Sequence, residues 1–294
     1  MSDTPAFAFD GVTKRYRDFL LRQRVTALRD FSIDVKAGEM VGLLGPNGSG
    51  KSTILKLASG LIAPSEGSVR LRGHDPRQAK ARAGLGYLPE ENANYPFLTA
   101  TQSVMLHLRL AGVARKEARS KAAELLERVG MTHAASRRCA GFSKGMSRRV
   151  GLAQCLAASP RLLILDEPTS GLDPIAVELV RDLIMDLKKQ GVSMLVSSHL
   201  MAEIDDLCDR VVVLSQGSVL RSGTLSDLLG QPGHYRASFE AKGSAEAAQK
   251  ALCEGKAEKL RVTPKLKTLA DFYRDVVGKA NDMPSVKSDS EKSG

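Results

Sequence analysis

The chain has 294 residues, of which 43% are hydrophobic and 4% aromatic, enough for one large globular domain or one domain with a small appendage. Its net charge of +10 would be compatible with binding to nucleic acid. However, the basic residues are dispersed among acidic ones, and no aromatic residues lie between them to stack on bases, so we do not expect nucleic acid to be the partner. No apolar run approaches the roughly 18 residues of a membrane-spanning helix, and the amino-terminal residues lack the pattern of a secretion signal, so we expect a cytosolic protein that reaches a membrane through a partner.

The amino-terminal part of the chain predicts strands followed by a loop and a helix. Apolar residues alternate between 7 and 12 and again between 31 and 35, which is the period of half-buried strands. The short apolar run Met40–Leu44 predicts a buried strand that feeds a glycine-rich loop, and residues 53–60 have helical character.

The loop reads GPNGSGKST over residues 45–53 and fits the phosphate-binding pattern G-x-x-x-x-G-K-[ST]. Its glycines allow backbone N–H groups to approach phosphate oxygens, and the helix that follows points its positive end at them. Lys51 is expected to neutralise the β- and γ-phosphates, and the Ser52 hydroxyl to ligate Mg²⁺. The predicted nucleotide-binding residues of this loop are Gly45, Asn47, Gly48, Ser49, Gly50, Lys51, Ser52 and Thr53.

The middle of the chain predicts a helical insert within an α/β domain. Thr99 and Gln102 have capping-box spacing before one helix, and a second helix is expected over 116–129. From Pro160 onward, apolar strands alternate with helices, with strands at 162–165, 193–197 and 211–214. This alternation predicts a largely parallel sheet covered by helices.

Two polar groups follow strands of this predicted sheet. The strand 162–165 delivers Asp166 and Glu167 at its carboxyl end, where open α/β sheets bind ligands. Asp166 is then the candidate to hold Mg²⁺ through water, and Glu167 to orient or deprotonate the attacking water. The alternative is a solvated acidic turn. His199 follows the next strand and is a candidate third group near the γ-phosphate, although a lone histidine in that place is often structural or exposed.

Beyond residue 230 the pattern weakens. Residues 231–280 predict a small appendage of one strand and two helices, and the Ser/Lys/Asp/Glu-rich stretch 281–294 predicts disorder. The domain boundaries expected from the sequence are therefore 1–230, 231–280 and 281–294.

The segment 142–149 reads FSKGMSRR and is followed by VGLAQCLAASPRLLILDEPTSGLDP. It is similar to the LSGGQ signature of ABC ATPases, placed just before the acidic strand end, and the chain resembles this family over roughly residues 5–230. The resemblance implies a P-loop NTPase fold of the ABC type: a mixed, mostly parallel sheet, an antiparallel amino-terminal sheet, and a helical subdomain at about 92–158. The weak carboxyl-terminal stretch stays outside it as the small appendage.

The resemblance also implies roles for particular residues. Ser143 and Gly145 match the signature residues that touch the γ-phosphate held by a second subunit, and Asp173 lies in a segment similar to the D-loop between the two sites. His199 matches the family's switch histidine. Tyr16 is the expected aromatic that stacks on adenine, its alternative being a half-buried tyrosine at the end of a strand.

The chain departs from the family pattern at three places. The spacing from Tyr16 to Gly45 is long, as though the basic stretch 17–24 were inserted. Glu90 stands where the family usually has the glutamine of the Q-loop, and its carboxylate is expected to meet Mg²⁺ or water. Lys144 and Met146 stand where Gly and Gln are usual in the signature. This form of the signature is similar to that of exporter-type subunits.

The resemblance implies an ATPase that uses ATP and Mg²⁺, dimerises around two ATP molecules, and drives a separate transmembrane permease without touching the cargo. Both half-sites look complete, which favours a homodimer at the cytoplasmic face of the membrane, with residues 95–97 as docking candidates. Two alternatives stay open: the motor subunit of an importer, and an ABC ATPase that acts on nucleic acid or ribosomes. The latter types usually carry two such domains or long heptad runs, which this sequence lacks.

Overall fold

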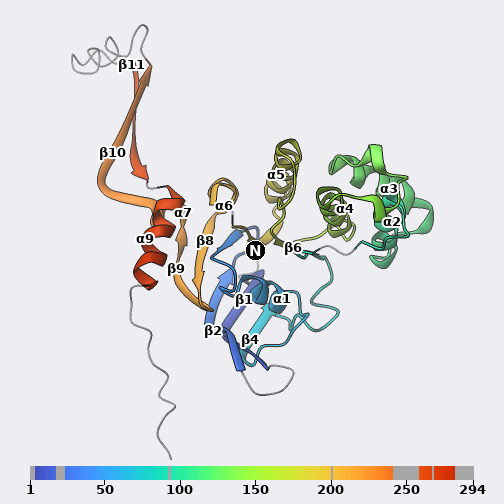
Figure 1. Cartoon of the computed structure of the whole chain (residues 1–294), viewed down its shortest axis with the longest axis horizontal. Helices are drawn as coiled ribbons and strands as arrows, with labels where there is room; N and C mark the ends of the chain where they lie inside the picture. Colours follow the sequence, from blue (N-terminus) through green and yellow to red (C-terminus); the bar gives the residue numbers. More distant parts are fainter. Residues whose placement is uncertain are drawn as a thin grey trace, which may run out of the picture. The chain divides into compact units, whose positions relative to one another are not determined.

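The computed structural model describes residues 4–17, 24–91, 94–199, 201–240, 258–266 and 268–281. The chain divides into two compact units, Met1–Gly223 and Thr224–Gly294, and each is described by itself (Figure 1). The sequence placed the boundary at residue 230. The division falls earlier because helix α7 (Leu225–Leu229), capped by the Thr224 side chain, packs with the elements that follow it.

The first unit is built on a six-stranded sheet. Its neighbouring strands β5 and β6, β6 and β7, β7 and β3, and β3 and β8 pair in parallel. The apolar runs predicted as buried strands are fully buried in β3, β6 and β7, as expected for strands covered on both faces. The strands in spatial order are β5 (Leu85–Leu88), β6 (Leu162–Asp166), β7 (Ser193–Ser197), β3 (Met40–Leu44), β8 (Arg210–Ser215) and β9 (Ser218–Thr224).

A second, antiparallel sheet has the order β2 (Arg24–Val35), β1 (Phe7–Arg17) and β4 (Glu66–Leu71). The period-2 pattern of the sequence predicts which side chains face inward, and those residues are buried. Phe9 and Phe31 meet edge to face, with ring centroids 5.2 Å apart. The fold predicted from the resemblance, with a mostly parallel sheet and an antiparallel amino-terminal sheet, is confirmed.

Helix α1 (Lys51–Ala58) lies between the two sheets, in contact with β2 and β4 on one side and β6 and β7 on the other. Its buried residues belong to one hydrophobic cluster with both sheets. Helices α5 (Pro174–Lys189) and α6 (Met201–Leu207) pack together, and α6 approaches the other face of β3 so closely that a Cβ on Gly42 would lie 2.9 Å from Ile204 and Cys208. The phosphate-loop helix is thereby held in the centre of the unit.

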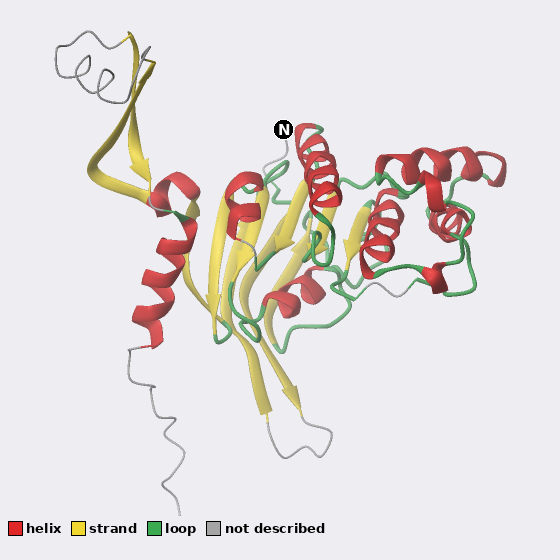
Figure 2. Cartoon of the chain, turned by 45° about the horizontal axis from the view of Figure 1, so that its top comes forward, coloured by secondary structure: helices red, strands yellow, loops and turns green. Residues whose placement is uncertain are grey.

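Three helices form a subdomain at the β5 edge: α2 (Ala100–Leu110), α3 (Arg115–Arg128) and α4 (Lys144–Leu156). Figures 1 and 2 show them gathered at one end of the first unit. The predicted capping box at Thr99 and Gln102 is present with both of its hydrogen bonds. Short 3₁₀ turns at Thr132–Ala134 and Cys139–Gly141 connect α3 to α4.

The second unit contains α7, the antiparallel pair β10 (Gly230–Glu240) and β11 (Glu258–Leu266), and helix α9 (Leu269–Asn281). The sequence analysis predicted one strand in this region, whereas the structure has two strands, β10 and β11, that pair with each other. Apart from Asn281, the stretch expected to be disordered lies outside the described residues. Within the described part of the chain, no helix combines the length and apolar character needed to cross a bilayer.

Candidate functional site

The residues predicted to carry the chemistry meet at one edge of the six-stranded sheet. The phosphate loop follows β3, Asp166 ends β6, and His199 follows β7, and these strands are parallel neighbours. Glu90 follows β5, which pairs with β6 in parallel. Carboxyl ends of parallel strands lie at the same edge, so four separate stretches of sequence are brought together there.

The phosphate loop requires glycine at defined positions. A Cβ on Gly45 would lie 2.5 Å from the carbonyl oxygen of Leu214 and from Ser49 Oγ. Gly48 and Gly50 have φ angles of 78° and 107°, in the left-handed region that glycine adopts without steric cost. The loop is thus shaped by its backbone, as a cradle of N–H groups around an anion must be.

Lys51 begins α1 and is buried, with 8% of its surface exposed. Its Nζ donates hydrogen bonds to the carbonyl oxygens of Gly45 and Pro46, at 2.6 and 3.1 Å, which holds the ammonium over the loop. Burial lowers the pKa of Lys51, and nearby carboxylates act against that shift. Those carboxylates are Glu167, Asp166 and Glu90. The acids predicted to serve the site therefore surround the phosphate-binding cation.

Asp166 is 3% exposed and is held by Ser197, whose Oγ donates to Asp166 Oδ1 at 2.5 Å. The Glu167 N–H in turn donates to both the carbonyl oxygen and the Oγ of Ser197, each at 3.1 Å. Ser197 is fully buried at the end of β7. One hydroxyl therefore sets the position of both neighbouring acids.

Glu167 has a left-handed backbone, with φ of 54°. A non-glycine residue in this region carries roughly 1–3 kcal/mol of strain and is kept there only by its surroundings. Its Oε2 lies 2.5 Å from Nδ1 of His199. An ionised carboxylate only accepts hydrogen bonds, so Nδ1 of His199 is the donor in this contact.

The oxygen donors at this edge fit a bound Mg²⁺. Ser52 lies half-buried in the first turn of α1, beside Lys51, and Asp166 supplies a hard carboxylate. Mg²⁺ in such sites is bound by one or two carboxylates together with phosphate oxygens and water. Among the described residues, no group of three or more His, Cys, Asp or Glu side chains could hold a metal ion by itself. We assign these contacts as predictions, with Glu90 as the third candidate.

The signature and D-loop residues lie against each other on the surface of the same chain. Ser143 is exposed and caps α4, accepting a hydrogen bond from the Met146 N–H at 3.2 Å. A Cβ on Gly145 would lie 3.0 Å from the carbonyl oxygen of Gly171. Asp173 caps α5 through its Oδ1. Contact of these residues with a second subunit stays a prediction.

Tyr16 lies near the end of β1, opposite Val25 of β2, with 38% of its surface exposed. The ammonium of Lys14 is 5.2 Å from its ring centroid. Further along β2, the carbonyl oxygen of Ala27 would be 2.8 Å from a Cβ on Gly50. The strand pair that carries Tyr16 therefore borders the phosphate loop, and its stacking on adenine stays a prediction.

Two residues of the site, Ser197 and Arg148, are not among those predicted from the sequence. Ser197 could have been suspected because it ends the strand that delivers His199. Arg148 is 2% exposed and lies on the buried face of α4 with Leu152 and Cys155. The helical spacing of these three residues was a signal that an arginine faces inward.

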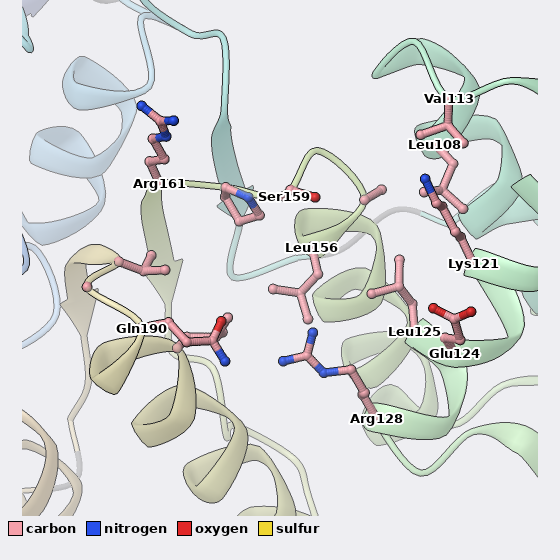
Figure 3. Close-up of a pocket in the computed structure, with 15 residues that line it drawn as sticks. Leu108, Val113, Lys121, Glu124, Leu125, Arg128, Leu156, Ser159, Arg161 and Gln190 are labelled. Atoms are coloured by element: carbon pink, nitrogen blue, oxygen red, sulfur yellow. The ribbon is translucent and has the colours of Figure 1, made fainter. Parts of the chain in front are cut away.

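A cleft of about 430 Å³ lies away from this edge, between the helical subdomain and the sheet. Figure 3 shows Leu125 and Arg128 of α3 on one side, Leu156 of α4 in the middle, and Gln190 after α5 on the other side. None of the predicted site residues lines it. Open space therefore separates this side of the helical subdomain from the core.

Comparison with known proteins identifies relatives of this arrangement. The sequence profile of the family described as "ABC transporter" matches residues 28–170. The linearmycin resistance ATP-binding protein LnrL of Bacillus subtilis is 39% identical over 210 residues, which cover 71% of this chain and 68% of the relative. The doxorubicin resistance ATP-binding protein DrrA of Mycobacterium tuberculosis is 36% identical over 229 residues, covering 77% and 68%.

Solved structures agree with this result. The dimeric structure of an ATP-binding cassette in a post-hydrolysis state, bound to ADP and Pi, superposes with a TM-score of 0.70 at 28% identity. The superposition covers 74% of this chain and 98% of the cassette.

Proposed function

This chain belongs to the ABC transporter family of ATP-binding proteins, and from that premise we propose that it is the ATP-hydrolysing motor of an exporter whose transmembrane permease is a separate subunit. The ATPase activity in this proposal is supported by one observation: the phosphate loop, the acidic pair Asp166 and Glu167, and His199 lie together at one edge of the sheet.

The chemistry follows from these residues. The loop backbone and Lys51 bind the phosphates, and Mg²⁺, when bound, neutralises charge on the β- and γ-oxygens. Glu167 accepts the proton of the attacking water, and His199, hydrogen-bonded to it, keeps the carboxylate oriented. Ser143 and Gly145 of a second copy complete each site, so that two copies close around two ATP molecules.

A surface groove supports docking of a permease. The groove, of about 490 Å³, lies between β5 and the helices α2 and α4, and its lining includes Tyr87, three residues before Glu90 in the sequence. Its lining also includes Tyr95, and Phe97 beside it is 67% exposed. Exposed aromatic side chains at a concave surface are typical of protein interaction sites.

Export is supported by two observations. The signature of this chain has the form FSKGM, and two of its relatives are named for resistance to linearmycin and doxorubicin. An importer motor is the competing proposal, and a solute-binding protein encoded beside this chain would favour it.

The ATPase assignment is tested by Glu167→Gln, which keeps the shape of the side chain and removes the base. We expect kcat to fall about 10²–10⁴-fold, the usual contribution of a general base, with nucleotide binding retained. Glu127→Gln, at an exposed position of α3, is the matched control and should hydrolyse ATP normally. Normal turnover in Glu167→Gln would show that another group is the base.

The permease is tested by affinity purification of the Glu167→Gln chain, with and without ATP, from detergent-solubilised native membranes. Co-purification of a polytopic membrane protein supports the transporter proposal. Recovery of ribosomes or nucleic acid with no membrane protein contradicts it and leaves an ABC ATPase of another kind.

The docking site is tested by Phe97→Ala, for which we expect about a tenfold loss of transport per ATP hydrolysed with ATP binding unchanged. Leu61→Ala is the control, because Leu61 is similarly exposed, at 64%, but follows α1, whereas the Phe97 ring packs on Tyr95 of the groove with centroids 5.8 Å apart. An unchanged ratio of transport to hydrolysis in Phe97→Ala would rule out this docking site.

A further inference from the structure

We propose that Arg148 is a positioning residue of the ATPase reaction, which ties the signature helix α4 to the two loops that carry Glu90 and Glu167. The proposal rests on the proposed function in one respect, the assignment of Glu167 as the base. It adds a residue whose side chain acts through main-chain carbonyl oxygens.

The contacts of Arg148 converge on two loops. Its Nη1 donates to the carbonyl oxygens of Pro89 and Glu90, at 2.5 and 2.7 Å. Its Nη2 donates to the carbonyl oxygens of Asp166 and Glu167, and its Nε donates to that of Pro168 at 3.4 Å. One guanidinium therefore bridges the segment after β5 and the segment after β6.

The geometry of these contacts suits arginine alone. A guanidinium presents five N–H donors in a rigid planar fork, whereas a lysine ammonium is a single point with three. The acceptors of Arg148 among the described residues are main-chain carbonyl oxygens. The carboxylates of Asp166 and Glu167 therefore stay available for their own partners, Ser197 and His199.

Burial lowers the pKa of Arg148, and the nearby carboxylates, Asp166 foremost, act against the shift. Arginine is in practice always charged in proteins. A buried cation is tolerated only when its donors are satisfied, and here the two loops satisfy them. The loops and the guanidinium therefore hold each other in place.

Glu167 needs such support because of its left-handed backbone. Ser197 holds its N–H, and Arg148 holds its carbonyl oxygen. Together they fix both sides of a strained residue whose side chain must point at the reacting water. Loosening either contact frees the backbone to relax to a commoner conformation and to turn the carboxylate away.

Because Arg148 belongs to α4, its hydrogen bonds also connect the two acidic loops to the signature residue Ser143. Ser143 caps the same helix little more than one turn earlier. At the other end of α4, Leu156 borders the cleft of Figure 3. A shift of the amino-terminal part of α4, produced when Ser143 meets the γ-phosphate of a second copy, is therefore passed through Arg148 to both acidic loops.

The test compares Arg148→Lys with Arg149→Lys in the full chain. Arg149 is the neighbouring arginine, and its Nη1 donates to the carbonyl oxygen of Gly130 inside the helical subdomain. We expect Arg148→Lys to lower kcat about 30-fold, equivalent to about 2 kcal/mol. The dissociation constant of a fluorescent ATP analogue should stay within about twofold, and Arg149→Lys should keep kcat within about twofold.

Hydrogen exchange gives a readout that does not depend on activity. Amides of residues 163–170 should exchange at least about tenfold faster in Arg148→Lys than in wild type, with no such change in Arg149→Lys. Arg148→Met, which keeps the length without the donors, serves as a second variant and should behave like Arg148→Lys.

Several results would overturn the proposal. Turnover of Arg148→Lys within twofold of wild type would do so, as would unchanged exchange at residues 163–170. A parallel loss of analogue binding, turnover and melting temperature would indicate a purely structural role. Failure of the proposed function is distinguishable, because it would show as normal turnover in Glu167→Gln whatever Arg148 does.

Discussion

Ser197→Ala tests whether one buried hydroxyl organises the acidic pair. The Oγ of Ser197 donates to the ionised Asp166 at 2.5 Å and accepts the Glu167 N–H at 3.1 Å. Alanine leaves no sizeable cavity, so the loss is that of hydrogen bonds. A hydrogen bond to a charged group contributes about 1.5–3 kcal/mol, and the Glu167 N–H keeps the Ser197 carbonyl oxygen as an acceptor. We therefore expect the free energy of unfolding to fall by about 2 kcal/mol.

Ser193→Ala is the matched control, because Ser193 is a buried serine at the opposite end of the same strand. Its Oγ accepts a hydrogen bond from a neutral group, the Gly38 N–H, at 2.9 Å. The expected loss is about 1 kcal/mol. In thermal melts these values correspond to shifts of roughly 6 °C for Ser197→Ala and roughly 3 °C for Ser193→Ala.

The two variants should differ more in ATP hydrolysis than in stability. Ser197→Ala releases Asp166 and weakens the support of Glu167, so we expect kcat/KM for Mg·ATP to fall at least about tenfold, or about 1.4 kcal/mol. Ser193→Ala should keep the wild-type value, since it lies at the other end of β7. Equal losses of activity in both variants, or full activity in Ser197→Ala, would refute the reasoning.

Three further predictions follow from buried groups. Gly45→Ala should abolish ATP binding and lower stability by about 1–3 kcal/mol, because its Cβ would lie 2.5 Å from a backbone oxygen. Gly141→Ala is the control, because the nearest atom to its Cβ would be Arg137 Nη2 at 4.0 Å, an ordinary contact, and it should leave both unchanged in calorimetry and melts. In the Lys51→Met variant, ATP should no longer raise the melting temperature, whereas the melting temperature of the nucleotide-free chain should not fall. The reason is that a lysine pKa lowered by burial opposes folding. This opposition is full below the folded pKa, fades between the folded and the unfolded pKa, and is absent above the unfolded one. Burial raises the pKa of Cys155 and Cys208 to about 12, so at pH 8 neither should react with iodoacetamide until the chain is unfolded, as peptide mass spectrometry would show; rapid labelling of the native chain would contradict their burial.

The sequence predicted those parts of the fold whose signals are local. Buried strands such as Met40–Leu44 and Leu162–Asp166 are continuous apolar runs, and the capping box at Thr99 is read from four residues. The second unit was predicted less well. The pairing of β10 with β11 joins residues 18 to 36 positions apart in the chain. Each strand has only a short apolar alternation, at Tyr235, Ala237 and Phe239 and at Leu260 and Val262, and such a pattern does not say which segment a strand pairs with.

In the site, too, local features were predictable from the sequence and the contacts between distant segments were not. The residue types of the phosphate loop, the acidic pair, the signature and the switch histidine are legible in the sequence because each motif is short and its chemistry requires particular residues at fixed spacing. The tertiary structure alone decided how they act together. It placed β7 between β6 and β3, left Glu167 with a left-handed backbone, and aimed Ser197 and Arg148 at its main chain. The physical reason is that strand order and the direction of a buried side chain depend on contacts between distant segments, and no local pattern of residues specifies those contacts.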